Sequence, residues 1–558
     1  LFFPERKIET TACLLISRLI CLAMHSLVKR AHYRPAFPET YINLIERFSR
    51  TRSLSGAKTL HACLVVAGLA RLTHFASKLI LLYSGCKQMP LARKVFDEIP
   101  CKNMRSWVVL IGGYSRNGCY KEAVSVFGDM LGRGLGPDVF VIPSVLKACG
   151  HLFDIRLGRV LHCVVLKGDS ERDVVVASSL IDMYCKCKEV VWGMRVFDRI
   201  LEKDLVAWNS MVAGCVQCGL VGQGLDLVEE MRVSGAAKPD MVTWNTLIYG
   251  FAQVGDETMV SRVIELMRLN GEKPDVVSWT SVISGLVKNF HTTKAFDAFR
   301  KMLRQGLLPT SNTISCLLPA CATVANVRRG KELHGYAVVA GAGGDLYVSS
   351  ALLDMYTKCG YISEARMLFS WMPERSTVTW NSMIFGYANH GYCNEAIGLF
   401  HQMEAEDCEK IDHLTFTAAL TACSHIGMVD QAKSLLISIK DKYKIVPRLE
   451  HYACLVDLLG KAGRTAEAYS LIQGMPMEPD LFIWGALLGS CRIHGDVDLA
   501  EIAARHLAKL EPGNAGNNML LKRLHADAGR QVDARMFKKH TKGKKLNRFS
   551  GCSWVEAS

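Results

Sequence analysis

Cysteine, histidine and carboxylate side chains are the groups in this chain that could hold a metal or catalyse a reaction, and their spacing argues against both roles. Cys215 and Cys218 form a Cys-x-x-Cys pair, but no second pair follows at zinc-finger spacing. A zinc deaminase needs a His-x-Glu pair and Pro-Cys-x-x-Cys, yet none of the 17 histidines is followed two residues later by glutamate. His401 and Glu404 lie three residues apart in a helical pattern and are expected to be solvated. The sequence therefore predicts no enzyme, no metal site and no cofactor.

The composition is that of a folded, basic protein. Hydrophobic residues make up 49% of the 558 residues and charged residues 22%, which is enough apolar surface to fold nearly the whole chain. Lys and Arg exceed Asp and Glu by 67 − 53 = 14. Such an excess suits a polyanionic partner such as nucleic acid, although a targeting segment also raises it. The 21 cysteines are scattered through apolar helical patterns, which favours a reducing compartment in which cysteine is a small core residue.

A repeat between Leu205 and Thr310 determines the elements on which these side chains lie. Three consecutive segments share one pattern, in which Trp208, Trp244 and Trp279 fall 36 and 35 residues apart and each segment closes on a proline. A fixed period of about 20–50 residues is typical of a stacked-repeat solenoid. Further copies extend the period in both directions, some of them in a shorter, 31-residue variant. The array is predicted to hold about thirteen units between residues 38 and 480.

Each unit has the pattern of two helices separated by a break. From Thr243 to Val254 apolar residues recur at helical spacing, Gly255 and Asp256 interrupt them, and a second helical pattern runs to about Asn270. A glycine and a proline then end the second helix. A hairpin of about 35 residues is too small to bury its own apolar faces. The sequence therefore predicts an all-α chain of antiparallel helical hairpins stacked on one another.

Residues 1–37 precede the repeats and are expected to be a leader. MHSLVKRAHYRPAF, from Met24 to Phe37, carries Lys29, Arg30 and Arg34 without an acidic residue, which is typical of the start of an organellar transit peptide. The apolar run before it is short and contains an arginine. A membrane span is therefore not expected.

The repeats resemble those of the pentatricopeptide repeat proteins of plants. Units such as LVAWNSMVAGCVQCGLVGQGLDLVEEMRVSGAAKPD, and the alternation of 35-, 35- and 31-residue units, are similar to the PLS subgroup of that family. RLEHYACLVDLLGKAGRTAEAYSLIQGMPMEPD is similar to the family's last repeat, and LFIWGALLGSCRIHGDVDLAEIAARHLAKLEPGNAGN to the first of its C-terminal E motifs. GCSWVEAS resembles the end of the second E motif, whereas residues 519–549 depart from its pattern.

The resemblance covers roughly residues 38–558. It implies an all-α, right-handed α-solenoid with the repeats over residues 38–480 and E-type motifs over residues 481–558. The DYW deaminase domain that ends many relatives is missing from the sequence.

The resemblance also implies a base-reading surface. In the family, each hairpin meets one base of single-stranded RNA, and the fifth residue of its first helix reads that base together with the last residue of the unit. Such readout is physically reasonable because unstacked bases expose their Watson–Crick edges. The implied pairs are Ser77 with Asn103, Ser178 with Asp204, Asn209 with Asp240, Asn245 with Asp275, Thr280 with Thr310, Ser350 with Ser376, and Asn381 with Asp412. Second-position residues would flank the bases as apolar wedges or could equally be core: Val206, Val242 and Val277.

The pairs imply different bases. The three asparagine–aspartate pairs are expected to favour uracil over cytosine, because an amide offers both a donor and an acceptor to a pyrimidine edge. Ser178 with Asp204 would favour guanine and Ser77 with Asn103 adenine, while the remaining pairs fall outside the well-defined combinations. The readable core is thus guanine followed by two uracils. Asn or Ser near a helix start is also a common capping residue, which is the alternative interpretation.

The resemblance implies a sequence-specific adaptor for organellar C-to-U RNA editing. It would bind single-stranded organellar RNA and recruit a DYW-type deaminase or other editing factors in trans. We expect a mitochondrial location, with the chloroplast as the alternative. A first alternative function is an organellar factor for RNA stability, splicing or translation. A second is a protein-binding scaffold of the tetratricopeptide type, whose period of 34 and different consensus fit this chain less well.

Overall fold

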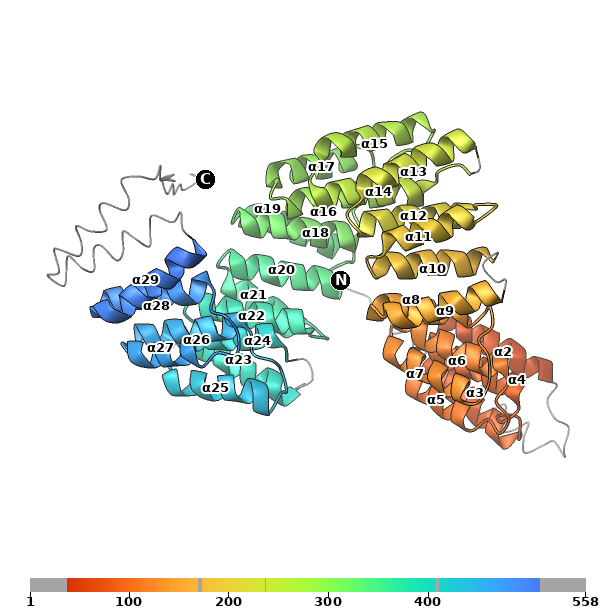
Figure 1. Ribbon diagram of the computed structural model, residues 1–558, viewed down its shortest axis with the longest axis horizontal. Helices are drawn as coiled ribbons and strands as arrows, with labels where there is room; N and C mark the ends of the chain where they lie inside the picture. Colours follow the sequence, from red (N-terminus) through yellow and green to blue (C-terminus); the bar gives the residue numbers. More distant parts are fainter. Residues whose placement is uncertain (1–37, 169–172, 236, 407–410, 512–558) are drawn as a thin grey trace, which may run out of the picture. The chain divides into compact units, whose positions relative to one another are not determined.

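The computed structural model describes residues 38–168, 173–235, 237–406 and 411–511 (Figure 1). These residues form 28 helices and no strand, which confirms the predicted all-α class. The predicted leader, residues 1–37, and the stretch 512–558 lie outside the described residues. None of the helices in the described ranges is both long and apolar enough to cross a lipid bilayer.

The helices alternate as first and second members of antiparallel hairpins. Thirteen hairpins precede residue 481 within the described residues, and one follows. The first members are α2 (Pro38–Thr51), α4 (Thr73–Gly85), α6 (Met104–Arg116), α8 (Ile142–Leu152), α10 (Val174–Lys186), α12 (Leu205–Gln217), α14 (Met241–Val254), α16 (Val276–Lys288), α18 (Ser311–Thr323), α20 (Leu346–Lys358), α22 (Thr377–Asn389), α24 (His413–Ile426), α26 (Leu449–Lys461) and α28 (Leu481–His494). The second members are α3 (Leu54–Val66), α5 (Met89–Asp97), α7 (Tyr120–Gly132), α9 (Ile155–Lys167), α11 (Val190–Arg199), α13 (Val221–Ser234), α15 (Glu257–Leu269), α17 (Thr292–Arg304), α19 (Val327–Val339), α21 (Ile362–Trp371), α23 (Cys393–Glu406), α25 (Val429–Asp441), α27 (Thr465–Gln473) and α29 (Val497–Leu510).

The hairpin α14–α15 shows how local sequence sets the helix ends. Asp240 Oδ1 accepts the Thr243 N–H at 2.9 Å, and Thr243 Oγ1 accepts the Asp240 N–H at 3.2 Å, so the two residues form a capping box. Gly255 ends α14 with a φ of 85°, a left-handed conformation that glycine adopts without strain. Asp256 then caps α15 by accepting the Met259 N–H at 3.0 Å. The helix–break–helix pattern predicted for this unit is confirmed.

The chain divides into two compact units, one up to Pro274 and one from Asp275. Within each unit, first helices of successive hairpins lie side by side and the second helices pack against them (Figure 1). Aromatic pairs fill the spaces between hairpins: in the first unit, the ring of Trp208 meets that of Phe197 edge to face, with centroids 4.9 Å apart. Each hairpin therefore buries its apolar side chains against the next, as expected for a repeat array.

Seven of the cysteines in the described residues are buried within this packing. No disulfide joins any of the seventeen cysteines that the described residues contain. Cys215 is buried, and the Cys218 thiol donates to the Cys185 carbonyl oxygen at 3.1 Å. Burial raises the pKa of Cys215 to about 11 and that of Cys185 to about 12, so these groups stay protonated at neutral pH. Nowhere in the described ranges do three or more His, Cys, Asp or Glu side chains form a group that could hold a metal ion.

A buried histidine makes the cap of α26 sensitive to acid. His451 is fully buried; its Nδ1 accepts the Arg448 N–H at 3.0 Å, and its Nε2 lies 2.8 Å from the His413 carbonyl oxygen. Because Nδ1 accepts, the ring proton is on Nε2, which donates to that carbonyl. Burial lowers the pKa of His451 below its ordinary value of 6.5, so the folded protein holds this ring neutral.

We expect the free energy of unfolding to fall as the pH drops through about 6.5, because the unfolded chain binds a proton that buried His451 does not. His451→Gln removes this titration and should make stability less dependent on pH, although it weakens the cap at neutral pH. Urea unfolding at about pH 7.5 and about pH 5.5 measures the difference. The matched control is His74→Gln, at an exposed position. An unchanged pH dependence in His451→Gln would contradict the prediction.

Candidate nucleic-acid interface

The predicted base-reading residues lie in the first turns of neighbouring first helices. Asn209 is the fifth residue of α12, and Asp240 is the N-cap of α14 in the next hairpin. Helices α12 and α14 pack side by side. The fifth residue of one hairpin and the last residue of its unit therefore meet across the helix pair, although 31 residues separate them in the sequence.

Asn209 and Asp240 are joined directly and through Thr243. The Asn209 amide nitrogen donates to Asp240 Oδ1 at 3.2 Å, and the Thr243 hydroxyl lies 2.6 Å from Asn209 Oδ1 and 2.9 Å from Asp240 Oδ1. The carboxylate only accepts hydrogen bonds, so it determines which end of the amide faces it. One amide hydrogen and one lone pair of the amide oxygen remain to meet a base.

The same arrangement recurs in the second unit. The Asn381 amide nitrogen donates to Asp412 Oδ1 at 3.0 Å, and the Thr415 hydroxyl lies 2.7 Å from Asn381 Oδ1 and 2.9 Å from Asp412 Oδ1. Asp412 is the N-cap of α24, as Asp240 is of α14. Two separate hairpins thus hold an asparagine amide in one fixed orientation.

Both aspartates are ionised at neutral pH. Burial raises the pKa of Asp240, but hydrogen bonds from the Thr243 N–H and hydroxyl and from the Asn209 amide outweigh it, so the pKa lies below its ordinary value. Asp412 behaves in the same way: burial raises its pKa, and hydrogen bonds from Thr415 and Asn381 bring it lower. Each carboxylate is therefore an acceptor that holds an amide donor.

The pair of Thr280 and Thr310 uses a similar bridge without an amide or a carboxylate. The Thr280 hydroxyl lies 2.7 Å from the Thr313 hydroxyl, which lies 3.1 Å from Thr310 Oγ1. Thr280 Oγ1 also lies 2.7 Å from the Val276 carbonyl oxygen. Only hydroxyl groups are available to a base at this hairpin.

The serine pairs are not joined in this way. Ser77 donates to the Thr73 carbonyl oxygen at 2.7 Å, Ser350 donates to that of Leu346 at 2.5 Å, and the buried Ser178 hydroxyl has no partner among the described residues. Their predicted partners serve as N-caps, accepting backbone N–H groups at 2.8–3.3 Å: Asn103 from Ser106, Asp204 from Ala207, and Ser376 from Thr379. The capping interpretation thus describes the last residue of a unit, whereas the fifth residue lies inside the helix.

The pair of Asn245 and Asp275 is divided between the two units. Asn245 lies on α14 in the first unit. Asp275 caps α16 in the second unit by accepting the Ser278 N–H at 2.8 Å. Their pairing stays a prediction from the sequence.

Several first helices carry an exposed apolar side chain at the second position. Val206, Val242 and Val277 are 58%, 58% and 56% exposed, so they are not core residues; their contact with bases stays a prediction. Large exposed apolar patches often mark binding sites. Alignment of the units by their period would have revealed the other exposed apolar side chains at this position, which the sequence analysis did not identify: Val175, Tyr347, Val378, Leu414 and Phe482.

Cationic side chains end five of the first helices, and sequence analysis did not identify them either. At 100° per residue, the thirteenth residue of a helix points in nearly the same direction as the second, about three turns further on. Three of the lysines pair with an aspartate four residues earlier, at 2.6–2.8 Å. The five residues are Arg116, Lys186, Lys288, Lys358 and Lys461.

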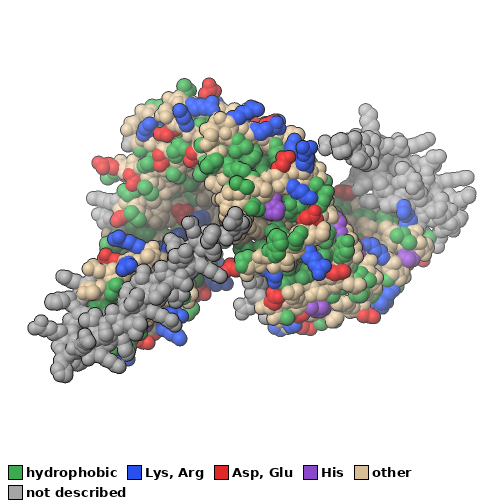
Figure 2. Space-filling model, turned by 180° about the vertical axis from the view of Figure 1, so that it is seen from behind, with side chains coloured by type: hydrophobic (Ala, Val, Ile, Leu, Met, Phe, Trp, Pro, Cys, Tyr) green, Lys and Arg blue, Asp and Glu red, His purple; other side chains and the backbone are tan. Residues whose placement is uncertain are grey.

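On the face that Figure 2 shows, charged side chains do not gather into one patch. Lys and Arg side chains on the visible face are mixed with Asp, Glu and hydrophobic side chains (Figure 2).

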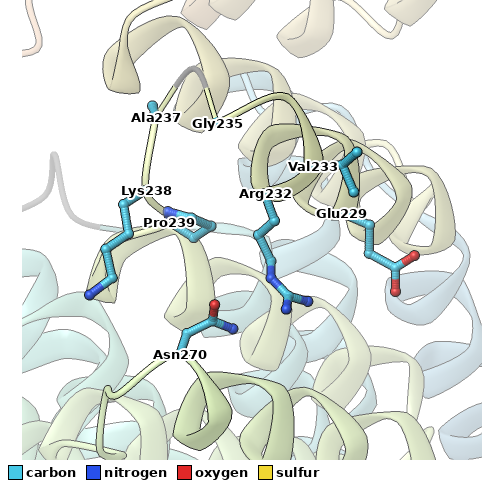
Figure 3. Close-up of a pocket in the computed structure, with 8 residues that line it drawn as sticks. All are labelled: Glu229, Arg232, Val233, Gly235, Ala237, Lys238, Pro239 and Asn270. Carbon is cyan, nitrogen blue, oxygen red and sulfur yellow. The ribbon is translucent and has the colours of Figure 1, made fainter.

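A pocket of about 490 Å³ lies beside the end of α13, with Arg232, Lys238 and Asn270 among its lining residues (Figure 3). No fifth-position side chain lines it, so it is separate from the predicted base-reading residues.

Glu404, which we expected to be solvated, is partly exposed and also links α23 to the residues that follow α25. It accepts hydrogen bonds from Lys442 and Tyr443, just after α25, while His401 Nδ1 lies 3.3 Å from it. These bonds, that from Lys442 first, lower the pKa of Glu404 to about 2. The sequence did not reveal these contacts because Lys442 and Tyr443 are 38 and 39 residues away.

Comparison with protein-family models matches most of the repeat array. The model described as PPR repeat family matches residues 203–253, 239–288, 274–323 and 375–425, and the model described as PPR repeat matches 105–135, 175–205 and 347–376. The E motif model matches residues 494–556, a range that includes the divergent stretch 519–549.

Known proteins of this kind are similar along most of the chain. Pentatricopeptide repeat-containing protein At5g59600 of Arabidopsis thaliana is 53% identical, covering 93% of this chain and 96% of its own length. The chloroplastic protein DOT4 of the same plant is 34% identical, covering 93% and 63%. Among solved structures, pentatricopeptide repeat protein PPR10 from maize is 16% identical, covering 97% of this chain and 98% of its own, with a TM-score of 0.35. The chain belongs to the pentatricopeptide repeat family and carries an E motif.

Proposed function

We propose that this chain binds single-stranded RNA in a sequence-specific manner and acts as an adaptor for organellar C-to-U editing, recruiting a DYW-type deaminase or other editing factors in trans. The observation that carries the proposal is the amide held by an ionised aspartate at Asn209 and again at Asn381. Each amide keeps one donor and one acceptor for a pyrimidine edge. Membership of the pentatricopeptide repeat family also supports RNA binding by this surface.

The rest of the first-helix face supplies the two other interactions that single-stranded RNA needs. Exposed apolar side chains at the second position, such as Val206 and Val242, offer flanking surfaces for unstacked bases. Lysines at the thirteenth position, such as Lys288, place positive charge on the same side of the helix for phosphates. Read in order, Ser178/Asp204, Asn209/Asp240 and Asn245/Asp275 specify guanine followed by two uracils.

The proposed organisation separates targeting, binding and recruitment. Residues 1–37 would direct the chain to mitochondria, with the chloroplast as the alternative, residues 38–480 would bind RNA, and residues 481–558 would recruit the editing partner. The E motif match over residues 494–556 supports the last assignment. In this scheme the chain provides specificity and another protein provides catalysis.

Organellar transcripts from plants with and without the protein test this function directly. We expect one or a few cytidines to stay unedited without it, in transcripts that carry the predicted guanine–uracil–uracil core near the affected site. Base-by-base sequencing of organellar RNA measures this, and restoring the gene is the control. Full editing together with altered transcript ends or unspliced introns would instead support the alternative role in RNA stability, splicing or translation.

The scaffold alternative has less support. The matched family models describe PPR repeats, and the amide–aspartate clusters provide hydrogen-bonding groups suited to base edges. We therefore do not propose a protein-binding scaffold of the tetratricopeptide type.

A further inference from the structure

We infer that Thr243 and Thr415 are positioning residues that set the base preference of the preceding hairpin, so that three residues and not two determine which base is read. The inference rests on the proposed function. Each threonine is the third residue of its helix and lies directly behind a predicted asparagine–aspartate pair. Neither residue belongs to the predicted base-reading positions.

Burial excludes direct contact between these threonines and RNA. Thr243 and Thr415 are both fully buried. Their hydroxyl groups nevertheless lie 2.6 and 2.7 Å from the oxygens of Asn209 and Asn381, the closest polar contacts that these two amide oxygens make. Any effect on base preference must therefore act through the asparagine.

The other hydrogen bonds of each threonine hydroxyl determine which atom donates in this contact. Each threonine oxygen already accepts the N–H of the N-cap aspartate, at 3.2 Å in both hairpins. Its single hydrogen has two acceptors within reach, the amide oxygen at 2.6 or 2.7 Å and the carboxylate oxygen at 2.9 Å, and the amide oxygen is the nearer in both hairpins. The amide is thus held at both ends, with its nitrogen on the aspartate and its oxygen on the threonine.

Holding both ends matters because the terminal torsion of asparagine is soft. The χ2 angle of an asparagine has a broad, roughly two-fold preference. A single hydrogen bond to the amide therefore leaves χ2 free to rotate, and the amide hydrogen and oxygen that meet the base change direction with it. Uracil and cytosine present reversed donor and acceptor patterns. A fixed amide orientation therefore discriminates between them better than a mobile one.

Other hairpins show that this contact depends both on the residue at that third position and on the fifth residue that it faces. Thr313 makes the equivalent contact with Thr280, at 2.7 Å. In α12 the third residue is Ala207, which has no hydroxyl, and Ser178 of the hairpin before it has no partner. In α22 the Thr379 hydroxyl donates to the Ser376 carbonyl oxygen at 2.7 Å, and Ser350 bonds its own helix.

Thr243→Val tests the inference in the full-length protein. Valine keeps the shape and the backbone N–H that bonds Asp240, but it removes the hydroxyl, and with it the bond to the Asn209 oxygen and the acceptor of the Asp240 N–H. We expect the preference for uracil over cytosine at the Asn209 position to fall about 2- to 10-fold, the value of one hydrogen bond. Binding to RNA that lacks the core should not change. The assay measures affinity for four single-stranded RNAs that differ only at that base.

Two further variants separate positioning from general structural damage. Thr243→Ser restores the hydroxyl and should restore the preference for uracil. Thr246→Val, on the same helix, removes a hydroxyl that donates to the Val242 carbonyl oxygen at 2.7 Å, and it should leave the base preference unchanged. Should Thr243→Val fail to fold, Thr415→Val provides the same test at the Asn381 position in the other unit.

The outcomes distinguish the inference from the proposed function. Wild-type protein without any preference for the matched RNA would overturn the function itself. Wild-type preference for uracil that persists undiminished in folded Thr243→Val or Thr415→Val would overturn the inference alone. Equal loss in Thr243→Val and Thr246→Val would also overturn it, because the loss would then follow from a weakened helix start.

Discussion

Asn209→Ser is expected to change the preferred base at its position from uracil to guanine. Serine is too short to reach Asp240, as the preceding unit shows: the Ser178 hydroxyl has no partner among the described residues, while Asp204 Oδ1 accepts the Ala207 N–H at 2.8 Å. A serine hydroxyl at the fifth position donates to the carbonyl oxygen four residues earlier, as Ser77 and Ser350 do. The site would then present acceptors only, the serine oxygen and the carboxylate released by the amide.

Guanine offers two adjacent donors on its Watson–Crick edge, whereas uracil offers one donor between two acceptors. An acceptor-only site therefore favours guanine, and each good pairing contributes about 1–3 kcal/mol of discrimination. We expect the ratio of affinities for uracil and guanine to change by about tenfold or more.

Binding of the full-length protein to RNAs with each of the four bases at this position measures the change. Asn381→Ser is the matched control: it should leave the preference at the Asn209 position unchanged and alter the one at its own hairpin. Continued preference for uracil in folded Asn209→Ser would show that the amide does not read the base.

Most of the fold could be predicted because each hairpin is defined by signals close together in the sequence. The period of Trp208 and Trp244, together with Gly255 between the helices, indicated the hairpin α14–α15. The register of the predicted pairs was also readable, since Asn209 with Asp240 and Asn381 with Asp412 occupy matching places in their units. Stacking neighbours then follows from the need to bury each hairpin's apolar side.

The hydrogen-bond partners within the site could not be predicted in the same way. Thr243 reaches Asn209 across 34 residues of sequence, and its hydroxyl could equally have donated to its own N-cap carbonyl, as Thr379 does. The choice depends on ångström-scale spacing between neighbouring helices. Likewise, Val206 fits a core or a surface by type, and only its position on the outer side of α12 decides for the surface.

Trp208→Ala is expected to destabilise the protein severely, by about 3–5 kcal/mol in the free energy of unfolding. The side chain is 2% exposed and packs edge to face against Phe197. Its indole N–H is buried and has no partner among the described residues, so the substitution breaks no hydrogen bond. The cost therefore comes from the lost apolar contacts and from the cavity that alanine leaves.

Urea unfolding followed by circular dichroism measures this cost, and Trp371→Ala is the matched control. Trp371 is 74% exposed at the end of α21, so its removal should change the free energy of unfolding by no more than about 0.5 kcal/mol. Because hairpins in an array are stable only when packed against their neighbours, the loss of stability caused by Trp208→Ala should extend to the hairpins beside α12. Similar unfolding midpoints for the two variants would contradict the assignment of Trp208 to the packed interior between hairpins.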